Sequence, residues 1–444
     1  MNTHRYFPHT PQDITRMLDR CGATALSDLW ADIPEELRLK HPYDIPAGLS
    51  EDSLRAYFDA LMSDVKPLVC FAGNGFYDHY TPAVIQDIAR RSEFLTAYTP
   101  YQPEISQGTL QYIFEYQSMI CELTGLDVAN ASLYDGSTAT AEAMLMCVAA
   151  ARKRNRVLLS ATVNDATRAV VATYARYHGI NLDIIPETDL GVTDLEAMKK
   201  MLDKGDVAGA IFASPNRHGI IEDFTGVADA LHSSKSLMAL NTHASALGLL
   251  HTPAEWGADI AIGEAQSLGM PVNFGGPGLG YMAVTKALMR KMPGRVVGAT
   301  TDANGQRVFV LTLQAREQHI RREKATSNIC SNQGLMTLWA AAYLALMGAE
   351  GLAEVNRLSH NGACALRKAL SDTGKVKDAF PGQPILNEFE VETIGIDADA
   401  VIKAGIEQGI LAGVKTDDNR LLIAVTERRT PEQINRLVNL FKSL

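Results

Sequence analysis

Short apolar segments alternate with helical patterns through the middle of the chain, and this alternation limits the possible folds more than any other feature. A helical pattern such as 165–177 fills the space between segments, and the segments themselves are 157–159, 209–212, 237–240 and 259–262. Buried strands separated by crossover helices form parallel sheets. The sequence therefore predicts an α/β domain whose mostly parallel sheet is covered by helices on both faces.

The pattern differs on both sides of this region. Residues 1–70 are punctuated by prolines and contain a helix start at Thr10-Pro11-Gln12-Asp13, which predicts an arm of short helices over the main domain. After about residue 330 we expect a long apolar helix at 333–347, a closing helix after Thr430-Pro431, and strands around 388–391, 410–414 and 421–425. The predicted domains are thus the arm at 1–70, the large α/β domain at 71–330 and a small α+β domain at 331–444.

Composition excludes several classes of protein. The 444 residues are 46% hydrophobic and carry a net charge of −10, which fits an acidic enzyme and argues against a general nucleic-acid binder. The six cysteines form no Cys-x-x-Cys pair, so we expect no metal site and a reduced, cytoplasmic compartment. Residues 1–6 lack the apolar core of a secretory signal, and the apolar run 338–347 is too short to span a membrane.

A glycine-rich run at 275–280 follows the segment 259–262. It does not match the dinucleotide fingerprint G-x-G-x-x-G, and it precedes a strand-like segment at 281–284 instead of opening a helix. In the large fold of pyridoxal-phosphate (PLP) enzymes, a strand, a cofactor lysine and a glycine-rich passage occur in this order. The run therefore favours a PLP-enzyme frame.

Four longer stretches make the resemblance specific: 71–77, 98–108, 263–280 and 316–330. They resemble the glycine dehydrogenase (decarboxylating) family, the P-protein of the glycine cleavage system. The resemblance covers nearly the whole chain, and the length is similar to that of subunit 1, the N-terminal half-subunit of the two-subunit bacterial form. It implies a PLP-dependent transferase-like (fold type I) large domain. It also implies an oxidoreductase that decarboxylates glycine, releases CO2 and passes the aminomethyl group to the lipoyl arm of H-protein.

The cofactor lysine of that family is missing. Aligning the glycine-rich run with the family's motif places Gln266 at the lysine position, and glutamine cannot form a Schiff base. The nearest lysines, Lys235 and Lys286, lie on either side of the segment, outside its reach. The resemblance then implies a homologous lysine-bearing subunit 2 that binds PLP covalently, with two such pairs in a tetramer that is active only when both subunits are present. H-protein is the direct partner, and the T- and L-proteins are functional ones.

The resemblance also points to a loop carrying Tyr98, Tyr101, Gln102 and Glu104, whose side chains are suited to bind substrate or to lie at the subunit interface. The alternative is an ordinary turn flanked by prolines that packs on the core.

A second group, Thr326, Ser327 and Asn328, follows the basic residues Arg321, Arg322 and Lys324. Hydroxyl and amide donors beside positive charge suit a phosphate, and we expect them to reach the phosphate of the partner's PLP. The alternatives are a helix N-cap and a solvated basic helix face.

Two further positions suggest a pocket that has lost its cofactor. Asp135 stands where active relatives cradle the phosphate, and it would repel one unless protonated or paired. Asn241 lies near the position of the aspartate that bonds the pyridine nitrogen, and the nearby His243 is better interpreted as a packed histidine.

Two other functions compete with this prediction. A self-sufficient PLP decarboxylase requires a lysine between 263 and 276, where the sequence has none. A non-catalytic structural or regulatory subunit of the same complex remains open.

Overall fold

A computed structural model describes residues 6–273, 275–325 and 327–444. The chain divides into two units, the first ending at Lys66 and the second running from Pro67 to Leu444. The domain boundaries at 70 and 330 stay a prediction.

The first unit contains helices α1 (Pro11–Cys21) and α2 (Glu51–Ser63). The predicted helix start is confirmed, because Thr10 caps α1 by accepting a hydrogen bond from the backbone N–H of Asp13. Within the first unit itself, α2 has no buried residue. Its large apolar side chains recur at helical spacing and form one exposed stripe: Leu54, Tyr57, Phe58, Leu61 and Met62.

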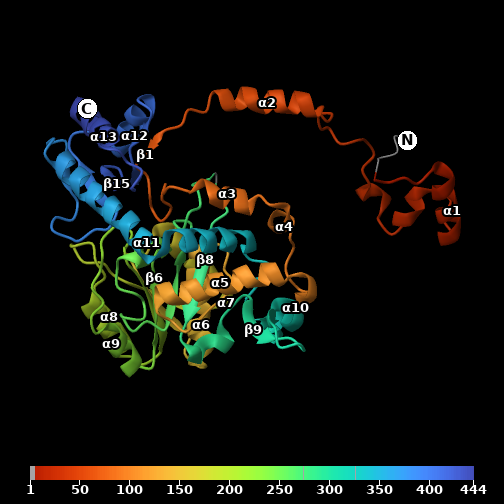
Figure 1. Cartoon of the computed structure of the whole chain (residues 1–444), viewed down its shortest axis with the longest axis horizontal. Helices are drawn as coiled ribbons and strands as arrows, with labels where there is room; N and C mark the ends of the chain where they lie inside the picture. The colour runs from red at the N-terminus through yellow and green to blue at the C-terminus, as the bar shows by residue number, and fades with distance from the viewer. Residues whose placement is uncertain (1–5, 274, 326) are drawn as a thin grey trace. The chain divides into compact units, whose positions relative to one another are not determined.

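The second unit is built on a seven-stranded sheet in the order β2-β8-β7-β6-β5-β3-β4. Strands β6 and β8 of this sheet are labelled in Figure 1. Strand β8 runs antiparallel to both of its neighbours, and the pairs from β7 to β4 are parallel. The strands are β2 (Val128–Ala129), β3 (Arg156–Ser160), β4 (Asn181–Ile185), β5 (Val207–Ala213), β6 (Leu237–Asn241), β7 (Ile260–Glu264) and β8 (Gly280–Val284). The predicted fold class is confirmed, and the four predicted strands are β3, β5, β6 and β7.

Helices cover both faces of this sheet, and each strand divides its apolar side chains between them with a period of two. On β3, Val157 and Leu159 pack in the cluster that contains residues of α6 (Gly136–Ala151) and α7 (Asp165–His178). Leu158 packs on the opposite side with α8 (Leu195–Leu202) and α9 (Val227–Ser233). Strands β7 and β8 contact α5 (Gln107–Thr124) and α11 (Gly334–Ser371) on that same side. Burial on both faces explains why these strands are continuously apolar.

Helix α11 is long and apolar enough to span a membrane by length and composition. Its side chains instead pack into three separate core clusters, with Leu338 in one, Tyr343 in the second and Leu366 in the third. Its backbone leaves helical geometry at Gly348, where φ is +60°. Helix α11 is therefore a core helix that links the large sheet to the smaller one.

The smaller sheet is antiparallel, in the order β11-β12-β15-β14, and packs against α11, α12 and α13. One predicted strand, 410–414, is wrong as a single element. Ile410 begins a short strand that pairs with β1, whereas Val414 begins a strand that pairs with β15. Gly413 lies between these two strands with φ of +152°. Glycine suits this position, because a Cβ there would lie 2.7 Å from the carbonyl oxygen of Leu422. The elements are β11 (Val376–Asp378), β12 (Glu388–Thr393), α12 (Ala398–Glu407), β13 (Ile410–Leu411), β14 (Val414–Asp417), β15 (Arg420–Ala424) and α13 (Pro431–Ser443).

Several elements were not predicted, among them an antiparallel hairpin of β9 and β10. The additional helices and strands are β1 (Val69–Cys70), α3 (Ala83–Ala89), α4 (Ser92–Leu95), β9 (Val296–Thr301), β10 (Arg307–Thr312) and α10 (Gln318–Arg321). Short 3-10 helices occur at Leu26–Trp30, Glu35–Leu37, Pro103–Ile105, Ala244–Gly248, Lys286–Lys291, Gln314–Arg316 and Arg322–Lys324.

The first residue of α6 tests how closely this helix approaches β7. A Cβ on Gly136 would lie 2.8 Å from the backbone nitrogen of Glu264, so Gly136→Ala forces the helix away from the strand. We expect a loss of about 1–3 kcal/mol in the free energy of unfolding, measured by urea denaturation. Gly108→Ala, near the start of α5, is the matched control, since a Cβ there meets nothing within 4 Å. Equal stability of the two variants would contradict the close approach.

Candidate functional site

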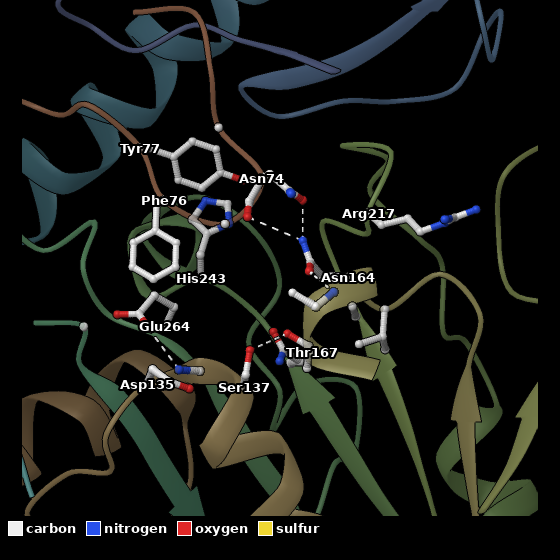
Figure 2. Close-up of a pocket in the computed structure, with 18 of the residues that line it drawn as sticks. Asn74, Phe76, Tyr77, Asp135, Ser137, Asn164, Thr167, Arg217, His243 and Glu264 are labelled. Atoms are coloured by element: carbon white, nitrogen blue, oxygen red, sulfur yellow. Dashed lines mark hydrogen bonds between the residues drawn. The ribbon is translucent and has the colours of Figure 1, made fainter. Parts of the chain in front are cut away.

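A cavity of about 510 Å³ opens where the carboxyl ends of the parallel strands meet. Its lining comes from the loops that follow β3, β5, β6 and β7, from the start of α6 and from the segment 73–77 (Figure 2). In open α/β sheets, this edge is where ligands bind. Asp135, Glu264 and Glu388 contribute carboxylates to the lining, and Arg217 contributes a guanidinium. No lysine is among the described residues that line it.

Glu264, the last residue of β7, holds three separate segments together. Its carboxylate accepts hydrogen bonds from the backbone N–H groups of Gly136 (2.9 Å), Gln266 (2.9 Å) and Leu279 (2.7 Å). Figure 2 shows the bond that reaches the start of α6, beside Asp135. Burial raises the pKa of this carboxyl, and the three N–H groups oppose that shift. The sequence analysis assigned no role to Glu264, although a carboxylate ending an apolar strand was a visible signal.

Gln266, at the predicted lysine position, is almost fully buried with 1% exposure. Its amide group serves the backbone around it. Its Oε1 accepts from the N–H of Tyr77 at 2.9 Å, and its Nε2 donates to the carbonyl oxygens of Tyr77 (3.0 Å) and Met270 (2.6 Å). The side chain thus ties the segment after β7 to the segment that carries Tyr77.

His243 lies in the cavity beside Tyr77, with the ring centroids 4.8 Å apart (Figure 2). Burial lowers the pKa of His243 to about 3, so the imidazole is neutral at physiological pH. The hydroxyl of Tyr77 donates to Glu388 at 3.0 Å, and the N–H of Asn74 donates to the same carboxyl at 2.6 Å. Burial raises the pKa of Glu388 to about 7, against the effect of the Asn74 N–H. The interpretation of His243 as a packed histidine stays a prediction.

The remaining polar groups of the cavity are engaged with one another. The hydroxyls of Ser137 and Thr167 lie 2.8 Å apart, and Asn164 donates to Asn74 (Figure 2). Arg217 donates to both Asp165 (3.0 Å) and Glu187 (3.0 Å). Its positive charge is therefore largely balanced by its neighbours.

The predicted loop at 98–104 lies elsewhere. Tyr98 is 77% exposed and Tyr101 42% exposed, and the side chains of Gln102 and Glu104 are exposed as well. Tyr101 is anchored, because Arg295 donates to its hydroxyl at 2.8 Å and also donates to the carbonyl oxygen of Cys330 at 2.5 Å. Tyr101 thus lies near Cys330, the last residue of the stretch 316–330, because Arg295 bonds both residues.

Of the second group, Thr326 lies outside the described residues. The hydroxyl of Ser327 donates to Glu142 of α6 at 2.9 Å, and Asn328 is exposed. Burial raises the pKa of Glu142 to about 7, with the Ser327 hydroxyl opposing the shift. The alternative of an N-cap does not hold for Ser327 and Asn328, since the next helix, α11, begins only at Gly334.

Neither predicted group lines the 510 Å³ cavity, among the residues that the structure describes. Ser327 and Asn328 border a second cavity of about 460 Å³ beside α6 and α7. Tyr98 borders another of about 200 Å³ together with Arg295. The chain therefore separates its own strand-end cavity from the side chains expected to serve a reaction. In the described parts of the chain, no cluster of three His, Cys, Asp or Glu side chains could hold a metal ion.

The raised pKa of Glu388 predicts a pH dependence of stability. The folded chain keeps this carboxyl protonated up to about pH 7, whereas the unfolded chain releases the proton near pH 4.5, the ordinary pKa of a glutamate. Between pH 4.5 and 7 the unfolded state therefore binds fewer protons than the folded state. The contribution of Glu388 to stability is complete below pH 4.5 and is lost as pH rises through 7. We expect Glu388→Gln to remove up to about 1.4 kcal/mol per pH unit from the fall in unfolding free energy between these values. Parallel curves for the two proteins, measured by urea denaturation, would refute this assignment.

Comparison with known proteins identifies the family. The model of the glycine cleavage system P-protein matches residues 4–441. The chain is 48% identical to a protein of Moorella thermoacetica named "Probable glycine dehydrogenase (decarboxylating) subunit 1", over 98% of both chains. A protein of Listeria monocytogenes with the same name is 43% identical, covering 99% of this chain and 98% of that one.

Solved structures agree in fold. A crystal structure of glycine decarboxylase (P-protein) of the glycine cleavage system, in inhibitor-bound form, matches with a TM-score of 0.90 at 41% identity, covering 99% of this chain and 100% of that chain. An alanine–glyoxylate aminotransferase of Nostoc matches with a TM-score of 0.62 at 15% identity, covering 86% of this chain and 96% of that one, which shows the fold type I architecture alone. The chain belongs to the glycine cleavage system P-protein family.

Proposed function

We propose that this chain is the subunit of the P-protein that completes an active site whose PLP lysine stands in a homologous partner subunit. The assembled enzyme decarboxylates glycine, releases CO2 and transfers the aminomethyl group to the lipoyl arm of H-protein, with the T- and L-proteins acting in the same system. The names of the relatives, "subunit 1", support a partner of this kind. The cytoplasm is the expected compartment, and a tetramer of two such pairs the expected assembly.

One observation carries the proposal. At the end of β7, the position expected for the lysine holds Gln266, whose side chain is buried and bonded to backbone groups. At the same time, the side chains predicted to serve the reaction are exposed or border other cavities. A chain with this arrangement is suited to present its loops to a neighbour's site.

The described contacts suggest what each loop does. PLP, held in the partner, supplies the electron sink for decarboxylation. The single hydroxyl proton of Ser327 is donated to Glu142, whereas the exposed side-chain amide of its neighbour Asn328 is suited to donate a hydrogen bond to the cofactor phosphate. Arg295 fixes the hydroxyl of Tyr101, while Gln102 and Glu104 remain exposed to meet glycine or the partner subunit.

The first unit supports a protein partner independently. The stripe Leu54–Met62 on α2 is apolar at every turn, and its five large side chains are 45–58% exposed. Apolar surface of this extent on one helix face is typical of a protein interface. We assign the lysine-bearing subunit as the occupant, because the names of the relatives already imply one.

The alternative is a structural or regulatory subunit of the same complex that contributes nothing to the chemistry. It predicts the same family and the same missing lysine. It differs in one respect, because the loops at 98–104 and 326–328 could then be changed without effect on the rate.

Glycine–bicarbonate exchange separates the two functions. We expect no exchange from this chain alone, little from the lysine-bearing subunit alone, and full exchange from the mixture with PLP present. In the mixture, Asn328→Ala should raise the PLP concentration for half-maximal exchange about tenfold, the effect of losing one hydrogen bond to a charged group. Asn304→Ala, which removes an exposed amide from the turn between β9 and β10, is the control.

Two results would contradict the proposal. Undiminished exchange by the lysine-bearing subunit alone would favour the structural alternative. Covalently bound PLP in this chain, detected by mass or absorbance, would show a self-sufficient site.

The stripe on α2 gives a separate prediction for assembly. Phe58→Asp places a charge in the apolar face, and we expect it to weaken association with the lysine-bearing subunit by tenfold or more, or about 1.4 kcal/mol. Ala56→Asp introduces the same charge on the opposite face of α2 and should leave association unchanged. The dissociation constants are measured by analytical ultracentrifugation, and equal effects of both variants would show that the stripe does not contact the partner.

A further inference from the structure

PLP-binding folds hold the cofactor phosphate at backbone N–H groups of a helix N-terminus, where the helix dipole favours negative charge. In this chain the corresponding helix is α6, whose first residues line the strand-end cavity. Whether the cavity fits PLP without a lysine therefore depends on whether these N–H groups are available.

Two of them, those of Gly136 and Thr138, are already bonded to carboxyl groups of the chain itself. The side chain of Asp135 caps α6 by accepting from the N–H of Thr138 at 2.7 Å. The carboxylate of Glu264 accepts from the N–H of Gly136, and its other oxygen accepts from Gln266 and Leu279. Three backbone N–H groups thus converge on one carboxyl group, as they do in an anion-binding site, and this carboxyl group belongs to the last residue of β7.

The surrounding backbone is packed closely around this carboxylate. A Cβ on Gly278 would lie 3.1 Å from the Oε2 of Glu264 and 3.2 Å from the Cβ of Asp135. A Cβ on Gly280 would lie 2.3 Å from the carbonyl oxygen of Asp135. The glycine-rich passage thus lies directly against the Glu264 carboxyl group and the residue that caps α6, at the border of the cavity.

Charge acts in the same direction. A phosphate ester entering the cavity would meet Asp135 and Glu264, and the guanidinium of Arg217 already pairs with Asp165 and Glu187. Like charges in a partly desolvated cavity repel strongly. The residues present do not fit PLP.

We infer that the carboxyl group of Glu264 occupies the phosphate position of this chain's own cavity, where it accepts three backbone N–H bonds, so that the cavity excludes PLP and other phosphate esters independently of the missing lysine. The inference concerns this chain alone and does not depend on the role proposed for its loops in a neighbour's site. It assigns Glu264 a structural task, which is to bond α6, β7 and the glycine-rich passage in place of a cofactor.

Rescue by added anions tests the inference on the full chain. Glu264→Ala frees three backbone N–H groups, so we expect a lower midpoint of thermal unfolding that rises with the concentration of acetate or inorganic phosphate. Phosphate should bind this variant at least about tenfold more tightly than the wild-type chain in isothermal titration calorimetry. Chloride at matched ionic strength corrects for the general effect of salt.

Glu142→Ala is the matched control. Glu142 is another buried carboxylate of α6, but the hydrogen bond described for it comes from the Ser327 hydroxyl and not from backbone N–H groups. Its loss should lower the unfolding midpoint without rescue by anions. Equal rescue of both variants, or none of Glu264→Ala, would overturn the inference.

A second measurement covers the case in which Glu264→Ala fails to fold. Wild-type chain and Gln266→Lys, which keeps Glu264, are incubated with PLP, reduced with borohydride and analysed by mass, and wild-type chain is titrated with PLP. We expect no phosphopyridoxyl group at position 266 and no saturable binding. A modified position 266, or wild-type binding of PLP that phosphate competes away, would overturn the inference without bearing on the exchange activity of the mixed subunits.

Discussion

Parallel pairing is the constraint on which the rest of this structure depends. Strands β3, β5, β6 and β7 run in one direction, so their carboxyl ends meet at one edge of the sheet and the loops that leave them converge there. The sheet is covered on both faces, so the edge is the part of it open to a ligand. The cavity, the predicted lysine position Gln266 and the Glu264 carboxyl group all lie at or just after the ends of these strands.

The structure divides binding groups between two places. At the strand ends, the polar groups bond one another, as Gln266 with Tyr77 and Glu264 with Gly136 show. Away from the strand ends, Tyr98 and Asn328 remain exposed, and nearby contacts with Arg295 and Glu142 order their neighbours. A cavity whose donors and acceptors are satisfied internally contributes rigidity. Exposed side chains on ordered segments are suited to bind something outside the chain.

The sequence predicted the fold class and the inner parallel strands of the sheet, but not its outer strands β2 and β4 or the bonding at its edge. Continuous apolar runs such as Val157–Leu159 predict strands that are buried on both faces of the sheet. The stretches 71–77, 98–108, 263–280 and 316–330 indicate the family. The hairpin of β9 and β10 was missed because its exposed residues hide the strand pattern. The separation of Ile410 from Val414 depends on a single glycine conformation. A carboxylate at the end of an apolar strand marks Glu264 as unusual, but its role was missed because its three partners are backbone groups, which the sequence does not identify.

The stripe on α2 also has a consequence for how much of this protein a cell can hold. In a chain made in excess of its proposed partner, the apolar side chains of Tyr57, Phe58 and Leu61 would stay exposed, and they could then contact a second copy of the chain. Such a chain is prone to aggregation and to quality control by chaperones and proteases. If the lysine-bearing subunit covers this stripe as proposed, balanced synthesis of the two subunits also keeps this chain soluble, apart from any requirement of catalysis.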